Sequence, residues 1–310
     1  MTDNLSLPNI QEADTLLSEL LQEVQKWEGT LAGGTKLGTG AAAVESLLKT
    51  QVSFGNPQDR LILLTEETFK ASGTELIGIY KQQMQTQYDF YYMTLTVGLR
   101  AQPGAQFRRL TCQLDFHPKG NNEPIIQSIF PNHKWRTIMN FGVGIDVGLN
   151  GNLEWSAGVD SAWLGELTNL LPGELKTNAA NKNELKAFLA LPEYKYELSH
   201  AEITAVGDGS STCYWRIQDP EIQKVGTAKF AVVFKVPKGT ESINLRGIVW
   251  AEPNMNWLTA DVRDVFSELS DRFKNLLRRK DEAAIQLARI ANEEWSLILP
   301  KATIPSEKIR

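Results

Sequence analysis

The feature that most constrains the fold is a long series of segments in which apolar and polar residues alternate. These segments run from Tyr88 to Trp250 and are separated by turn residues, for example at 102–104 and 237–239. Alternation with a period of two is typical of strands with one buried face. About eight or nine such strands at this spacing favour two packed antiparallel sheets. The sequence therefore predicts an α+β protein with an antiparallel β-sandwich at its centre, and the turn at 102–104 predicts a hairpin.

A second hairpin, at 141–159, has the clearest local pattern in the chain. In both arms apolar residues alternate with small, polar or acidic ones, and Asn150-Gly151 between the arms is typical of a two-residue type I′ turn. The apolar positions include Phe141, Val143, Ile145, Val147, Leu149, Leu153, Trp155 and Val159. One face of this hairpin is therefore expected to pack inside the protein or to enter a membrane.

Amphipathic helices are predicted on both sides of the sandwich. Residues 9–28 carry apolar side chains at three- and four-residue steps, with Gly29 placed to end the helix. The same spacing over 261–296 predicts a long C-terminal helical stretch, as one helix or two. The expected organisation is a helical region at 1–87, a sandwich at 88–257 with a helical insertion at 163–192, a helical segment at 258–299 and a flexible tail at 300–310.

Composition narrows the function classes. The net charge is -5 and the 32 Lys and Arg residues are dispersed, so nucleic acid is not an expected partner. The N-terminus has no signal-peptide pattern, and no apolar run reaches the roughly 18 residues of a membrane-spanning helix, so a cytoplasmic location is expected. The two cysteines, Cys112 and Cys213, are too few for a disulfide framework or a cysteine-rich zinc site.

Motifs with catalytic associations are incomplete. Gly142–Gly148 has the alternating glycines of a phosphate-binding hairpin, but it lies among antiparallel strands, and Gly29–Lys36 has threonine and lysine in the wrong order for a P-loop. Asp115 and His117 place two metal-ligand types on one strand face. Three histidines in the whole chain do not make a metal site, so no catalytic residue, metal or cofactor is predicted.

Three functions remain open. The first is a non-catalytic interaction or self-assembly module whose helices bind a protein partner or a second copy. The alternative is a soluble membrane-active protein of the pore-forming type that inserts the 141–159 hairpin, whose arms of about nine residues match the roughly 9 to 11 of a spanning strand. The second alternative is a hydrolase of unknown substrate. Trp135 and Trp257, beside turns, are candidates for exposed aromatic contacts, and the sequence does not identify a small-molecule ligand.

Overall fold

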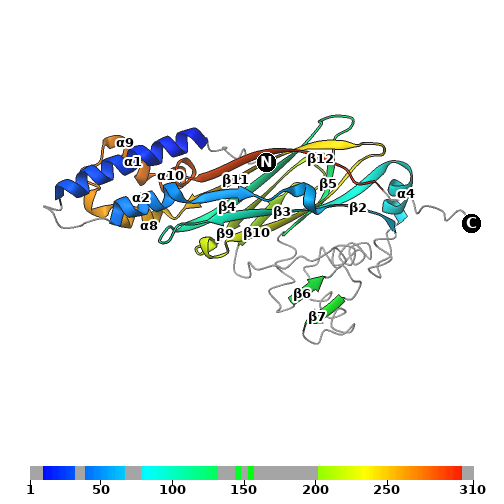
Figure 1. The fold of residues 1–310 in the computed structure, drawn as a ribbon, viewed down its shortest axis with the longest axis horizontal. Coiled ribbons are helices and arrows are strands. Elements are labelled where there is room, and N and C mark those ends of the chain that lie inside the picture. The colour runs from blue at the N-terminus through cyan, green and yellow to red at the C-terminus, as the bar shows by residue number, and fades with distance from the viewer. Residues whose placement is uncertain are drawn as a thin grey trace, which may run out of the picture.

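The protein is built from two stacked antiparallel sheets with helices at the ends. The computed structural model describes residues 10–31, 39–66, 78–131, 144–147, 153–156 and 202–301. Figure 1 shows an elongated body with helices of both terminal regions gathered at one end of the sheets and α4 (Gly78–Thr86) at the other. This architecture confirms the predicted α+β sandwich.

The first sheet, sheet A, has five strands in the order β1-β3-β10-β5, with β2 also paired to β3. Its strands are β1 (Gln51–Phe54), β2 (Leu61–Leu64), β3 (Tyr88–Arg100), β5 (Ile125–Phe130) and β10 (Thr227–Pro237). The long central pair β3 and β10 runs antiparallel from the Gly98–Thr227 pair to the Tyr88–Pro237 pair. Because β1 and β2 come from the first 66 residues, the region expected to be helical at 1–87 also supplies an edge of this sheet.

The second sheet, sheet B, has five strands in the order β12-β11-β4-β9-β8. Its strands are β4 (Phe107–His117), β8 (Glu202–Val206), β9 (Thr212–Gln218), β11 (Ser242–Pro253) and β12 (Arg289–Ile298). All four pairings within it are antiparallel.

The main core lies between the inner faces of the two sheets. On β3 the odd-numbered residues face inward, and on β4 the even-numbered ones from Leu110 onward do, as their burial alternates along the strands. The largest fully buried side chains are aromatic, and Trp215 of β9 lies 4.8 Å from Phe230 of β10, ring centre to ring centre. This pair joins the two layers directly.

The turn at 102–104 does not make a hairpin. It connects β3 in sheet A to β4 in sheet B, and the two strands pair with different partners. The prediction was wrong because an arch between layers and a hairpin within one layer need the same alternation: in both, each strand buries one face.

The amphipathic N-terminal helix is present and its apolar stripe is buried. Helix α1 (Ile10–Leu31) continues two residues past Gly29, and α2 (Thr39–Lys49) lies beside it. The stripe consists of Ala13, Leu16, Leu17, Leu20 and Val24, all buried, with Leu21 and Trp27 partly buried against the main core. This stripe is therefore used inside the protein.

A buried carboxylate joins the two N-terminal helices. Glu28 of α1 accepts hydrogen bonds from the backbone N of Gly40 (2.9 Å) and Ala41 (3.3 Å), at the first turn of α2. A carboxylate suits this place because the free amides of a helix N-terminus carry partial positive charge. A Cβ on Gly40 would lie 2.9 Å from Glu28 Oε1 and 3.2 Å from the Asp261 carbonyl oxygen, so glycine permits this close junction.

The long C-terminal helix is replaced by short helices and a strand. The chain forms α8 (Met255–Asp261), the 3-10 turn η4 (Arg263–Val265), α9 (Asp271–Arg278), α10 (Lys280–Gln286) and then β12. The apolar residues of these helices, from Leu258 to Leu287, are buried in the main core. The helical segment expected at 258–299 therefore ends at Gln286, and its last part is an edge strand.

Side chains close the long side of the sandwich where β12 and β1 meet. Trp295 of β12 lies edge-on to Phe54 of β1, with ring centres 5.2 Å apart, and covers Gly247 of β11. Gln58, in the 3-10 turn η1 (Pro57–Arg60), donates to the Ile298 carbonyl (2.9 Å) and accepts from the Ile298 N–H (2.7 Å). The amide of Gln58 thus substitutes for a strand partner of β12.

Candidate functional site

The predicted 141–159 hairpin is represented by two short paired strands. β6 (Gly144–Val147) and β7 (Leu153–Ser156) run antiparallel and form a two-stranded sheet separate from sheets A and B. Their register pairs Ile145 with Trp155 and Val147 with Leu153. Directly opposed residues of an antiparallel pair lie on the same face, so these four apolar residues share one face of the hairpin.

The opposite face holds small and acidic residues. Gly144 is paired with Ser156, and Asp146 with Glu154. The two-residue turn expected at Asn150-Gly151 lies outside the described residues. Regular pairing from such a turn would place Val147 opposite Glu154, which would mix the two faces, whereas the observed register keeps them separate.

The chain that carries this hairpin is attached at both ends to edge strands. It leaves sheet A after β5 and enters sheet B at β8; among the strands that the structure describes, β5 pairs with β10 alone and β8 with β9 alone. These edges lie side by side: the Ile126 N–H donates to the Ser210 carbonyl (2.9 Å), and the Gly209 N–H donates to the Ile126 carbonyl (2.8 Å). Both attachments are therefore on one long side of the sandwich, the side opposite β12.

Several predicted residues lie outside the described residues. They are Phe141, Val143, Leu149, Val159 and Trp135, together with the insertion at 163–192 and residues 302–310 of the tail. Trp257 lies in α8, partly buried against the main core. Its use as an aromatic contact stays a prediction.

Asp115 and His117 are brought together at the end of β4. Asp115 Oδ2 lies 3.2 Å from His117 Nε2, while Asp115 Oδ1 accepts hydrogen bonds from Lys119 Nζ (2.5 Å) and Thr212 Oγ1 (2.7 Å). Lys119 also donates to Ser211, which in turn donates to Glu123. This network ties the loop after β4 to the start of β9.

The network affects the ionisation of Asp115. Burial acts to raise its pKa, but the hydrogen bonds from Lys119 and Thr212 and the charges of Lys119 and His117 outweigh burial, so the pKa is lowered from its ordinary value. Within the described ranges no group of three or more His, Cys, Asp or Glu side chains could hold a metal ion. The geometry at Asp115 is that of a structural ion-pair network.

Both cysteines are fully buried free thiols in neighbouring strands. Cys112 lies in β4 and Cys213 in β9, and burial raises the pKa of each thiol far above its ordinary value. Because the thiolate is the reactive form, neither thiol is poised for nucleophilic chemistry.

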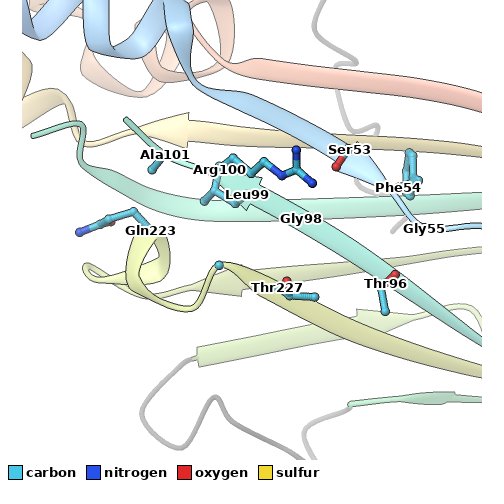
Figure 2. A pocket seen from close by; sticks show the side chains of 11 residues that line it. Ser53, Phe54, Gly55, Thr96, Gly98, Leu99, Arg100, Ala101, Gln223 and Thr227 are labelled. Atoms are coloured by element: carbon cyan, nitrogen blue, oxygen red, sulfur yellow. The ribbon is translucent and has the colours of Figure 1, made fainter. Parts of the chain in front are cut away.

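A groove lies on the outer face of sheet A, at the end near the helices (Figure 2). The outer face changes character along β3, with buried Phe90 and Tyr92 towards one end and Thr96, Gly98 and Arg100 towards the other. The groove has a volume of about 540 Å³ and is formed by Ser53, Phe54, Gly55, Thr96, Gly98, Leu99, Arg100, Ala101, Gln223, Gly226 and Thr227. No sequence motif marks it, because its residues come from three separate segments of the chain.

None of the helices that the structure describes combines the length and the apolar character needed to cross a membrane.

The sequence matches no known protein family and no curated protein. Among solved structures, one described as a pore forming protein is 8% identical, covers 66% of this chain and 78% of its own, and has a TM-score of 0.31. The membrane-inserted NetB toxin of Clostridium perfringens is 9% identical (54% of this chain, 77% of the toxin, TM-score 0.23). The collagen adhesin of S. aureus is also 9% identical, and the match covers 54% of this chain and 39% of the adhesin, with a TM-score of 0.19. These similarities are distant, extend to toxins and adhesins alike, and establish no function.

Proposed function

We propose that this protein is membrane-active, of the pore-forming type, and that it inserts the 141–159 hairpin into lipid as part of an oligomer. The observation that carries the proposal is the register of β6 and β7. It sets Ile145 and Trp155 opposite each other on one face and Asp146 and Glu154 opposite each other on the other face. A strand pair in a membrane barrel needs this division, with apolar residues towards lipid and polar residues towards the lumen.

The hairpin's attachment fits a segment that changes position. β5 and β8 each have one partner among the described strands, so a change in position of the hairpin between them would remove no strand from the interior of either sheet. The bonds between Ile126 and the turn at 209–210 hold the two edges together at the base of the segment. The sandwich would thus serve as the rigid body from which the hairpin is delivered.

Self-association is a physical requirement of this function. A two-stranded sheet leaves unpaired backbone groups on both edges, and in hydrocarbon each unpaired group costs several kcal/mol. Hairpins from several copies must therefore pair edge to edge and close a barrel. The partner that this proposal names is a second copy of the same chain.

A module that binds partners through its amphipathic helices has less support. The apolar stripe of α1 and most apolar residues of α8, α9 and α10 are already buried or partly buried in the protein's own core. Binding through them would require the helices to leave that core, so the hairpin is the better-supported source of function.

Release of a dye from liposomes tests the proposal. An arginine near the bilayer midplane costs roughly 2 to 4 kcal/mol per strand, so Ile145→Arg is expected to slow release about thirtyfold or more. The matched control is Ser156→Arg, which adds the same charge to the same hairpin on the other face and should retain most of the activity. The thermal midpoints of both variants should stay close to that of the parent protein.

Two results would count against the proposal. One is the absence of release by the unmodified protein under every trigger applied, including limited proteolysis and a range of lipid compositions. The other is an equal loss of activity in Ile145→Arg and Ser156→Arg, because the two faces would then be equivalent.

A further inference from the structure

The groove on the outer face of sheet A has a hollow at its centre. Gly98 of β3 is paired with Ser53 of β1 on one side and Thr227 of β10 on the other, so these residues form one row across the sheet. A Cβ at Gly98 would lie 3.1 Å from Ser53 Oγ. Gly98 therefore places no side chain between the hydroxyl residues Ser53 and Thr227, and a Cβ there would crowd Ser53 Oγ.

A second glycine shapes the neighbouring wall. Gly55 donates its backbone N–H to the Thr96 carbonyl (2.8 Å), and a Cβ on Gly55 would come within 2.1 Å of Thr96 Oγ1. Any other residue at position 55 would have to displace Thr96 or the end of β1. Glycine here lets the chain pass close to Thr96 and keeps the groove open.

Arg100 supplies a cation on the same face. It lies two residues from Gly98 on β3, so both residues share the outer face of the sheet. Figure 2 shows its side chain extending towards Ser53. The guanidinium group is exposed and makes no hydrogen bond or ion pair with any residue in the described part of the chain. Its donors are therefore available to a ligand.

The charge balance of the groove favours an anion. Its lining includes Arg100 and the hydroxyl groups of Ser53, Thr96 and Thr227, and none of the described residues that line it is Asp or Glu. A guanidinium group has five donors in a planar fork that matches two oxygens of an oxyanion, and hydroxyl groups can donate to the remaining oxygens. The preferred ligand is a compact, multiply oxygenated anion.

We propose that this groove binds a phosphoryl group, with Arg100 contacting two of its oxygens and Ser53 and Thr227 donating to the others over Gly98. Two sources share this chemistry: a soluble phosphate ester and the phosphate of a lipid headgroup. The site goes beyond the membrane-active function proposed above and does not depend on the 141–159 hairpin.

The test measures binding of both sources to the full-length protein. Isothermal titration with glycerol phosphate reports on a soluble ester, and co-sedimentation with phosphatidic acid vesicles reports on a lipid headgroup. Arg100→Gln removes the guanidinium group, and Gly98→Val fills the hollow with a residue that strands tolerate. The matched control is Arg263→Gln, which removes an exposed guanidinium group at the helical end, outside the groove.

Each of the two groove variants is expected to weaken binding of the recognised source about tenfold or more, whereas Arg263→Gln should change it less than about twofold. Binding of glycerol phosphate alone would assign a soluble ligand, and vesicle binding that both groove variants weaken would assign a lipid headgroup. Vesicle binding that neither groove variant weakens would overturn the proposal. Failure of the parent protein to bind either source would overturn the proposal. So would equal weakening by Arg100→Gln and Arg263→Gln, which would indicate attraction to net charge. Arg100→Gln and Gly98→Val leave the 141–159 hairpin unchanged, so weaker binding by these variants reports on the groove and not on the hairpin.

Discussion

The two long sides of the sandwich are held together in different ways. On the side of β1 and β12, side chains bridge the sheets: Trp295 packs on Phe54, and Gln58 makes two hydrogen bonds to the backbone of Ile298. On the side of β5 and β8, backbone hydrogen bonds join Ile126 to the turn at 209–210. The chain that contains β6 and β7 leaves and re-enters on this second side. We call these the closed side and the hairpin side.

This difference suggests that the two sides have different roles. Bulky and bidentate contacts on the closed side oppose separation of the two sheets. On the hairpin side, the connecting chain carries a hairpin that pairs with neither sheet among the described residues. Under our proposal the closed side supplies stability and the hairpin side supplies membrane activity. Variants on the two sides should therefore affect different measurements.

The largest effect on stability is expected from Trp295→Ala on the closed side. The change removes the contact with Phe54 and leaves a space above Gly247. Loss of a large aromatic side chain from such a site lowers the free energy of unfolding by about 3 kcal/mol. Urea denaturation can measure this change.

The control for this variant is Glu294→Ala, an exposed neighbour on the same strand, which should cost no more than about 0.5 kcal/mol. If Trp295→Ala costs no more than Glu294→Ala, the closed side does not hold the sheets in the way described here.

A smaller effect is expected from Gln58. Gln58→Ala loses both hydrogen bonds to Ile298 and should lower the free energy of unfolding by about 1 to 2 kcal/mol. Gln58→Glu can still accept from the Ile298 N–H but cannot donate to its carbonyl. Its loss of stability should therefore be intermediate, and a Gln58→Glu protein as stable as the parent would argue against the two-bond bridge.

The smallest effect is expected from Asp115 on the hairpin side. The pKa of Asp115 is lowered in the folded protein, so the carboxylate contributes stability at pH values above its unfolded pKa of about 3.9, and this contribution is lost as the pH falls through the folded pKa. Because the side chain is partly exposed, solvent screening limits the contribution to about 1 kcal/mol or less.

Asp115→Asn measures this contribution directly. The difference in unfolding free energy between the parent and Asp115→Asn should be constant from pH 7 to 5 and should shrink below about pH 3.9. A difference that changes steadily between pH 7 and 5 would assign the effect to a group other than Asp115.

Sequence patterns predicted the sandwich because alternation reports burial of one face. They could not separate β12 from a helix. Ala291 and Trp295 are four residues apart, and residues four apart share a face in a strand as well as in a helix. In the structure Ala291 is paired with Val249 and Trp295 with Leu245. Only the presence of β11 as a partner decides between the two.

The two candidate sites also differ in how far the sequence could predict them. The hairpin was predicted because its alternating pattern is local. Its register was not predicted, because a two-residue turn at Asn150-Gly151 implies a pairing that would mix apolar and polar residues on each face. The groove was missed because Ser53, Gly98 and Thr227 become neighbours only when β1, β3 and β10 pair.

The most direct test of the central claim places a polarity-sensitive fluorophore on single cysteines along the hairpin. The native Cys112 and Cys213 are buried, and burial keeps their thiols protonated, so they should not react. On addition of vesicles, labels at 145, 147, 153 and 155 should shift to the emission of a hydrocarbon environment, whereas labels at 144, 146, 154 and 156 should stay in water. Equal responses at odd and even positions, or no response at any of them, would contradict insertion of this hairpin.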